Sequence, residues 1–310
     1  MRQAVLLFNP NAGRGGAARL SQLQLAAAVL RNSGIEPEII ATHGPASAAS
    51  QANQAVSAGA TLIFACGGDG TLHDVIQGIA TNLAVTVGIL PLGSANALAR
   101  HFGLSLDPAE AMRQQLEFTA RLIPLGRVTC ETAEGTCSRY FAVMAGAGPD
   151  GALVYRMLAA GKQRIGRSIY YLRAARLFAG SQFSPFRITL NNSVERRAVS
   201  AMTVRVGDLG GLFSPLIRGA SPTDETLRLA ITQPPSHLSL PAWFVMSWAR
   251  LHRWNPYSQV LDVESFCCSE GLHRRVHVQA DGEWIGHTPM RVEIVPNALR
   301  LLMPTSPPER

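Results

Sequence analysis

The 310-residue sequence predicts an α/β domain with a parallel, three-layer sheet, followed by an antiparallel β-sandwich. Over about the first 120 residues, short apolar strands alternate with alanine-rich helical segments, a pattern typical of a parallel sheet covered by helices on both faces. Glycine clusters follow several of these strands. From about Ile123 onward, short alternating runs are separated by turn residues, as in antiparallel sheets.

The first half is expected to contain four strands, each followed by a helix. The strands are short apolar runs, and the helices are longer segments rich in small and unbranched residues. In chain order these elements are the strand Ala4–Phe8, the helix Ala17–Ser33, the strand Pro37–Ala41, the helix Ala46–Ala58, the strand Thr61–Cys66, the helix Thr71–Ala80, the strand Val85–Pro91 and the helix Ala95–Phe102.

The second half is expected to be rich in strands, with two helical interruptions near Ala152–Ala179 and Leu240–Arg253. We place the domains at residues 1–122 and 123–295, with the tail 296–310 returning to the first domain. The alternating runs that predict strands are Arg139–Val143, Phe186–Leu190, Ala201–Val206, Leu227–Thr232, Val260–Phe266, Arg275–Ala280 and Met290–Ile294.

The composition excludes a disordered chain, because 47% of the residues are hydrophobic and only 16% are charged. The net charge of +7 implies an anionic partner, either a phosphate-bearing ligand or an acidic membrane surface. Nucleic acid is not expected, since basic runs interleaved with aromatic residues are missing. No apolar stretch reaches the roughly 18 residues of a membrane-spanning helix. We therefore expect a cytoplasmic protein with reduced cysteines, although Cys130 and Cys137 could face each other across a hairpin.

The strongest chemical signal is the segment Gly67-Gly68-Asp69-Gly70-Thr71, which follows the strand Thr61–Cys66. Glycines allow backbone amides to approach a phosphate closely, and the start of a helix, which Thr71 could cap, favours an anion. Asp69 makes sense beside phosphates as a Mg²⁺ ligand or a base. Alternatively, the segment is a tight strand-to-helix turn with a capping acid.

Two further loops follow strands of the same sheet. One contains Asn9 and Pro10 with Gly13 and Arg14, and could supply amides and a guanidinium to a polyphosphate. The other, residues 90–97, offers hydrogen-bonding side chains. Ligands of open α/β sheets bind at the carboxyl ends of the strands, so three such loops together predict a phosphate site. No P-loop or dinucleotide fingerprint occurs.

These motifs resemble the diacylglycerol kinase catalytic-domain family, which includes bacterial lipid kinases and the sphingosine and ceramide kinases. The resemblance spans nearly the whole chain. It rests on Asn9-Pro10 with its glycines, Gly67–Thr71, Pro91-Leu92-Gly93-Ser94 with Asn96, Gly210-Gly211 before Pro215, and Asp281-Gly282-Glu283 before Thr288-Pro289.

The resemblance implies an ATP- and Mg²⁺-dependent lipid kinase, with ATP and lipid meeting between the two domains. Asp69 would bind or orient Mg²⁺, Asp281 would be the general base with Glu283 supporting metal or base, and Asp150 would lie near the lipid headgroup. Without the resemblance, Asp281 could equally be the first position of a turn before Gly282. The implied nucleotide-binding residues are Asn9, Pro10, Gly13, Arg14, Thr42, Gly67, Gly68, Gly70, Thr71, Gly93, Ser94, Asn96 and Glu283.

Some residues depart from the family pattern. The loop that usually carries Asp-Gly at an accessory Mg²⁺ site reads Thr223-Asp224-Glu225-Thr226, so Asp224 or Glu225 would have to serve as ligand. Ala97 stands where many bacterial relatives have Asp, as in sphingosine-kinase-like sequences, and hints at a sphingoid base or ceramide as substrate.

Two segments bear on membrane contact. Basic residues are interspersed with apolar ones over Tyr155–Phe178, and Trp243, Trp248 and Trp254 lie in a second, mostly apolar segment. Either these are ordinary amphipathic helices, or they contact a membrane surface. We expect a peripheral enzyme at the inner face of the membrane. The competing hypotheses are a soluble-substrate kinase of the NAD kinase type and a non-catalytic nucleotide-binding regulator.

Overall fold

The computed structural model describes residues 2–10, 16–44, 46–159, 177, 182–191, 194–207, 209, 217–251 and 254–305. The chain divides into two compact units. The first comprises Met1–Leu125 and Pro296–Arg310, and the second is Gly126–Val295. The predicted boundary lies between residues 122 and 123, and the predicted tail begins at residue 296.

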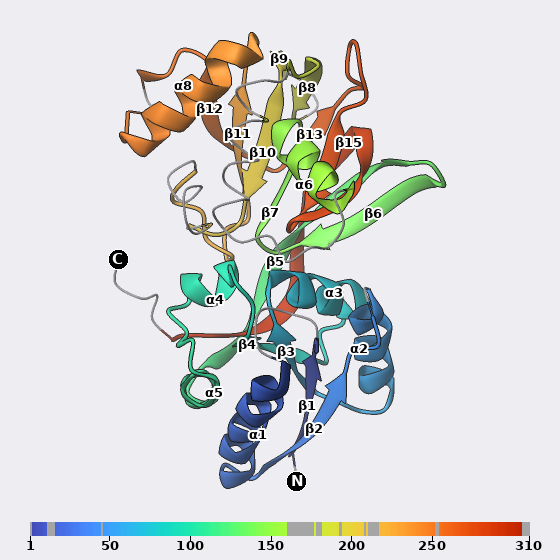
Figure 1. The fold of residues 1–310 in the computed structure, drawn as a ribbon, viewed down its shortest axis with the longest axis vertical. Coiled ribbons are helices and arrows are strands. Elements are labelled where there is room, and N and C mark those ends of the chain that lie inside the picture. The colour runs from blue at the N-terminus through green and yellow to red at the C-terminus, as the bar shows by residue number, and fades with distance from the viewer. Residues whose placement is uncertain are drawn as a thin grey trace. The chain divides into compact units, whose positions relative to one another are not determined.

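The first unit is built around a parallel sheet with the strand order β2-β1-β3-β4-β15. The order of the strands along the chain reverses between β1 and β3, which is where open sheets of this kind bind ligands. In chain order the elements are β1 (Arg2–Phe8), α1 (Gly16–Asn32), β2 (Ile35–Ala41), α2 (Ser47–Ser57), β3 (Leu62–Gly67), α3 (Asp69–Ile79), β4 (Thr86–Pro91), α4 (Ala97–His101), α5 (Pro108–Leu116) and the end of β15 (Glu283–Met303) (Figure 1).

Both faces of this sheet are buried. On one face, Leu6 and Phe64 pack against the apolar side of α1, including Leu23 and Leu30, and against Met112 of α5. The helices α2 and α3 lie on the other side of the sheet (Figure 1). Burial on two faces explains why β1, β3 and β4 are nearly continuous apolar runs. The predicted parallel α/β domain is confirmed.

The second unit is an antiparallel β-sandwich, as predicted. One layer has the order β12-β11-β10-β7-β14-β15, and the other joins β15 to β13, β8 and β9 on one side and to β5 and β6 on the other. Its elements are β5 (Thr119–Thr132), β6 (Gly135–Phe141), β7 (Met144–Ala147), α6 (Pro149–Ala159), β8 (Phe186–Leu190), β9 (Val194–Ala198), β10 (Ser200–Val204), β11 (Leu227–Thr232), α8 (Ser236–Trp248), β12 (Ser258–Val263), β13 (Ser265–Cys268), β14 (His277–Ala280) and the start of β15.

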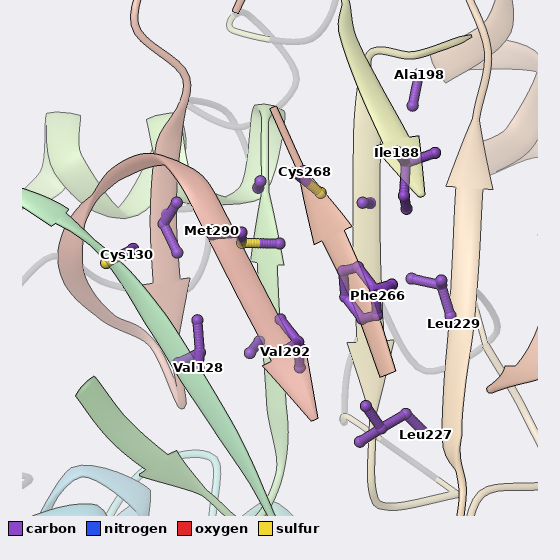
Figure 2. Close-up of a cluster of buried hydrophobic side chains, with 14 of the residues drawn as sticks. Val128, Cys130, Ile188, Ala198, Leu227, Leu229, Phe266, Cys268, Met290 and Val292 are labelled. Carbon is purple, nitrogen blue, oxygen red and sulfur yellow. The ribbon is translucent and has the colours of Figure 1, made fainter. Parts of the chain in front are cut away.

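The core of this unit lies between the two layers. Leu227 and Leu229 of β11 face Phe266 of β13, while Val128 and Val292 fill the neighbouring part of the cluster (Figure 2). All five are buried. The strand β15 contributes to both layers, since it pairs with β14 at its start and with β13 further along. This shared strand fixes the β14–β15 hairpin against the core.

Several predicted bounds differ from the structure. The run Val260–Phe266 is divided into β12 and β13, because Glu264 interrupts the ladder. The helix α3 begins at Asp69, so Thr71 lies within its first turn and does not cap it; the N-cap is Gly68. The helix predicted over Ala152–Ala179 is described only as α6, since residues 160–176 lie outside the described residues. In the described part of the chain, no helix is long and apolar enough to cross a membrane.

The β5–β6 hairpin places Cys130 directly opposite Cys137, as the sequence suggested. Both are free thiols in this structure, and so are the other three cysteines. Burial raises the pKa of Cys130 to about 12, so its thiol stays protonated at neutral pH.

Candidate active site

Backbone hydrogen bonds join the loops at the carboxyl ends of the parallel strands in the first unit. The amide of Asn9, after β1, donates to Cys66 O at 3.3 Å, and the amide of Gly93, after β4, donates to Gly67 O at 3.1 Å. The amide of Thr42, after β2, donates to Phe8 O at 2.8 Å. The structure therefore brings together the three predicted loops and the residue Thr42.

The Gly67-Gly68 and Gly93 loops approach each other as closely as two backbones can. A Cβ atom at Gly93 would lie 2.3 Å from Gly68 Cα, so a side chain at residue 93 would clash with backbone. Asn96 fixes this loop, since its Oδ1 accepts from Gly93 N at 3.1 Å and its Nδ2 donates to Gly93 O at 3.0 Å. Asn96 is buried in a left-handed conformation (φ 51°), which asparagine tolerates.

Asp69 is the first residue of α3 and lies at the meeting point of these loops. Its Oδ1 accepts a hydrogen bond from Ala97 N at 2.7 Å, at the start of α4. The N-terminal amides of α3, near Gly68 and Gly70, supply the positive end of the helix dipole. Thr71 is buried in the same turn. The arrangement suits an anion with an accompanying cation, because amides and one carboxylate stand side by side.

Of the other residues predicted for this site, two are exposed and two lie outside the described residues. Pro10 is exposed, and its carbonyl accepts a hydrogen bond of 3.5 Å from the buried Arg19. Ser94 is exposed in the loop before Asn96. Gly13 and Arg14 lie outside the described residues. Arg19 was not singled out in the sequence, because one arginine in an alanine-rich helix reads as a solvent-facing residue.

In the second unit, Asp281 and Gly282 form the two-residue turn of the β14–β15 hairpin. Both have positive φ (48° and 84°), as a type I′ turn requires. The Asp281 carboxylate accepts three backbone hydrogen bonds, from the amides of Ala142, Val143 and Met144, at 2.9 to 3.0 Å. Its own amide donates to Met144 O at 2.7 Å. Asp281 therefore anchors the hairpin to the segment between β6 and β7.

Glu283 follows this turn as the first residue of β15. Its side chain is exposed, and its carboxylate makes no hydrogen bond with any described residue. The two acids of the Asp281-Gly282-Glu283 motif are thus in opposite situations. One has both oxygens engaged by backbone amides, whereas the other presents its carboxylate to solvent.

Asp150, in the first turn of α6, is connected to the same hairpin through Gln279. Gln279 Nε2 donates to Asp150 Oδ2 at 3.0 Å, and Gln279 Oε1 accepts from Gly282 N at 3.0 Å. Burial raises the pKa of Asp150 to about 6, and the Gln279 bond and the nearby amides of α6 oppose this only in part. Its Oδ1 is buried and has no hydrogen-bond partner among the described residues. This acid is poised to accept a hydrogen bond from a ligand.

Aromatic and imidazole rings flank the Asp150–Gln279 pair. Tyr155 of α6 stacks on His277 at 4.2 Å between ring centroids, and Trp284 Nε1 donates to His277 Nδ1 at 3.2 Å. Burial, together with the neighbouring His287, lowers the pKa of His277 to about 4. His277 is therefore neutral at pH 7. The rings of Tyr155, His277 and Trp284 thus form an uncharged surface near Asp150.

The loop predicted to hold an accessory metal already surrounds a cation. The buried guanidinium of Arg205 donates to the carbonyls of Asp224 and Thr226 at 2.8 Å and of Pro222 at 2.7 Å. Burial lowers the pKa of Arg205 to about 10, which leaves it protonated. The signal in the sequence was a single arginine inside the apolar run Ala201–Val206.

The two acids of that loop differ in their surroundings. Asp224 Oδ2 accepts from Ser221 N at 2.7 Å and closes a turn, and Glu225 is exposed. Among the described residues, no group of three or more His, Cys, Asp or Glu side chains could hold a metal. The loop does not fit an accessory ion, whose carbonyl ligands Arg205 has taken. Asp69 does fit a Mg²⁺ that arrives with phosphates, since such ions need only one or two carboxylates.

The fold and the joined loops of the first unit fit a phosphotransferase built from two units. Comparison with known families agrees. Residues 3–128 match the diacylglycerol kinase catalytic domain, and residues 143–303 match the YegS C-terminal NAD kinase beta sandwich-like domain. The chain belongs to this family of diacylglycerol and lipid kinases, and it is a kinase.

Individual relatives cover nearly the whole chain. A diacylglycerol kinase from Staphylococcus saprophyticus is 24% identical over 93% of this chain and 91% of its own length. A protein from Chromohalobacter salexigens named as a YegS-like lipid kinase is 26% identical over 94% of this chain and 91% of its own length. The crystal structure of a diacylglycerol kinase from Bacillus anthracis superposes with a TM-score of 0.74, at 21% identity, covering 98% of this chain and 97% of its own.

A more distant structural neighbour bears on the alternative hypothesis. Yeast NADH kinase complexed with NADH superposes with a TM-score of 0.55 at 10% identity, over 98% of this chain and 84% of its own. This likeness concerns the fold alone. The NAD kinase fold is therefore related, but the sequence relatives bear lipid kinase names.

Proposed function

We propose that the chain transfers the γ-phosphate of ATP to a hydroxyl group of a membrane lipid, working from the water side of the bilayer. The names of its relatives support diacylglycerol as the first acceptor to test. One observation carries the proposal: the loops after β1, β3 and β4 are hydrogen-bonded to one another where α3 begins at Asp69. A lipid-binding role of the second unit is part of the same proposal.

The first unit would bind the nucleotide. Backbone amides around Gly68 and Gly70 face the ATP phosphates, with Asn96 and Thr42 holding the loops in place. Asp69 holds the Mg²⁺ that accompanies ATP, and this ion supplies charge neutralisation at the phosphates. Phosphoryl transfer needs little covalent help, so positioning and charge account for most of the catalysis.

The proton of the acceptor hydroxyl needs a base, and the geometry favours Glu283 over Asp281. A base must have an oxygen available to the reacting hydroxyl. The Asp281 carboxylate already accepts three backbone amides, whereas the Glu283 carboxylate is exposed. We therefore assign Asp281 to positioning the hairpin and Glu283 to accepting the proton, which reverses the roles expected from the resemblance.

Asp150 would orient the acceptor headgroup. Its buried Oδ1 has no hydrogen-bond partner in the described part of the chain, and its Oδ2 is linked through Gln279 to the turn that precedes Glu283. A hydroxyl that donates to Asp150 would thus be held beside the base. Ala97 is buried at the start of α4 and its amide is bound to Asp69, and the substrate hint drawn from this residue stays a prediction.

The test is a phosphorylation assay with γ-labelled ATP and Mg²⁺ in mixed micelles. The acceptors are diacylglycerol, sphingosine, ceramide and, for the alternative kinase class, NAD. Chromatography separates the products. We expect label in phosphatidic acid. Label in NADP would establish the NAD kinase type, and ATP binding without transfer to any acceptor would establish a regulator.

A further inference from the structure

The helix α8 presents one apolar face that nothing in the described structure covers. Its opposite face is buried, where Leu240 and Trp243 pack against Met202 and Ala230 of the sheet. The exposed side carries Leu238, Pro241, Val245 and Trp248, spaced at three, four and three residues. That spacing places them along one stripe of the helix. A helix on a water-facing surface would normally carry polar residues along such a stripe.

The exposure of this stripe is large, and it continues beyond the helix. Val245 is 63% exposed and Trp248 is 61% exposed; further along the chain, Trp254 is 79% exposed. We define the apolar face of α8 as Leu238, Val245, Trp248, Leu251 and Trp254, all exposed. Contiguous apolar surface of this kind marks an interaction site, whereas single exposed apolar residues are ordinary.

The charge around this face matches an anionic surface. The sequence from residue 227 to residue 261 contains no Asp or Glu, and the exposed Arg250 follows Trp248 closely in the sequence. The whole chain has a net charge of +7. Tryptophan is the residue that most often sits at the headgroup level of a bilayer, with its ring in the apolar layer and its N–H in the polar one.

We infer that the apolar face of α8 inserts into the headgroup boundary of an anionic bilayer. An interfacial helix combines an apolar stripe, tryptophans and basic residues, and all three occur here. The helix lies alongside β11 of the sandwich (Figure 1), so insertion would hold the second unit at the lipid surface. The inference rests on the proposed function, since a lipid acceptor resides in that surface.

The test uses vesicles of phosphatidylcholine and phosphatidylglycerol that contain no diacylglycerol. Val245→Asp places a charge within the stripe, and Trp254→Ser removes the most exposed ring. Leu272→Ser, at another exposed apolar residue of the same unit, is the matched control. We expect each of the first two variants to bind the vesicles at least tenfold more weakly than the parent and the control to bind normally. Brominated lipids should quench the parent's tryptophan fluorescence and quench that of Trp248→Ser less.

Two outcomes would overturn the inference. One is unchanged vesicle binding by both Val245→Asp and Trp254→Ser, with the fold verified by circular dichroism. The other is a parent dimer in sedimentation velocity that these variants dissociate while vesicle binding persists, because the face would then be covered by a second copy.

The proposed function is judged separately. Phosphorylation of a short-chain, water-dispersed diacylglycerol should be equal in the parent and in Val245→Asp. Vesicle binding that depends on this face, with no lipid phosphorylated, would support the inference while the proposed activity fails.

Discussion

Asp69, the first residue of α3 in the first unit, and Asp281, in a hairpin turn of the second unit, are both acids whose carboxylates accept hydrogen bonds from backbone amides. Asp69 stands at the start of α3, and the amide that it accepts, from Ala97, belongs to the neighbouring loop. Asp281 accepts three amides from one short segment, residues 142–144, and returns its own amide to the same segment. Asp69 lies among backbone amides that suit a phosphate ligand, whereas both carboxylate oxygens of Asp281 already accept hydrogen bonds from the protein backbone.

Because of this difference, we do not assign a catalytic role to an acid only because its turn matches a family motif. The decisive property is how many of its oxygens the protein has already engaged. By that measure we propose Glu283 as the base and Asp281 as a positioning residue, while Asp69 is a candidate because of its place among the loops of the first unit. The following substitutions test the distinction, beginning with the largest expected effect.

Asp69→Asn should eliminate measurable turnover. The amide oxygen of asparagine can still accept from Ala97 N, so the loops stay joined, but the charge that would hold Mg²⁺ is lost. Steady-state kinetics with increasing Mg²⁺, together with thermal unfolding, measure both effects. Activity within a few-fold of the parent in excess Mg²⁺ would show that Asp69 is only a capping acid.

Glu283→Gln should lower kcat on the order of 10² to 10⁴-fold, the usual contribution of a general base. The KM for ATP should change little, because the phosphate loops belong to the other unit. Since the Glu283 side chain is exposed and its carboxylate makes no hydrogen bond with the described residues, stability should not change. If kcat stays normal, the base must be sought elsewhere, with Asp150 the next candidate.

Arg205→Met should destabilise the second unit by about 3 kcal/mol, because three buried carbonyls lose a charged donor. Arg205→Lys is the control, as it keeps the charge with fewer donors and should lose less. Denaturant unfolding without nucleotide measures both. The stability of the parent should be the same in EDTA and in Mg²⁺. Stabilisation by Mg²⁺ under these conditions would mean that the loop holds a metal after all.

Asp281→Asn should lower the free energy of unfolding by about 2 kcal/mol. The Nδ2 group of asparagine would face the Ala142 amide, and both groups are hydrogen-bond donors. Faster amide exchange at residues 142–144 would show where the loss occurs. Its effect on kcat should be smaller than that of Glu283→Gln. A larger loss of kcat with unchanged amide exchange would restore Asp281 as the base.

The fold was predicted well from the sequence where local signals are strong. The alternation of apolar strands with helices predicted the bounds of β1 to β4 to within two residues at each end. These strands are readable because both of their faces are buried. The helix α5 was missed although its start was readable. Asp107 accepts from Glu110 N at 2.8 Å, and Pro108 occupies the first turn, which is a standard helix start.

The site was predicted in part. Spacing and glycines identify the loops of the first unit, because the carboxyl ends of parallel strands share one edge. The proposed exchange of roles between Asp281 and Glu283 could not be predicted, since it is argued from amides 137 to 139 residues away in the sequence. Gln279 was missed for the same reason: alternation assigns it a face, but only the tertiary structure shows that it bridges Asp150 and Gly282.

Asp150 gives the smallest expected effect and a pH dependence of definite sign. Its pKa is raised from 3.8 to about 6 in the folded protein, mainly by burial. A raised folded pKa means that the native state binds the extra proton between these values. The stability from this group is therefore fully present below about pH 4 and is lost as the pH rises through 6. Asp150→Asn, which can still accept from Gln279, lacks this titration.

The stability of Asp150→Asn relative to the parent should thus rise by on the order of 1 kcal/mol between pH 4 and 7, since the residue is partly exposed and water reduces the full shift. Unfolding of both proteins at several pH values in this window measures the difference. His277 contributes equally to both, so its own titration cancels. A constant difference across the window would mean that Asp150 is hydrated and ionised in the native state. It could not then be the desolvated acceptor that the headgroup role requires.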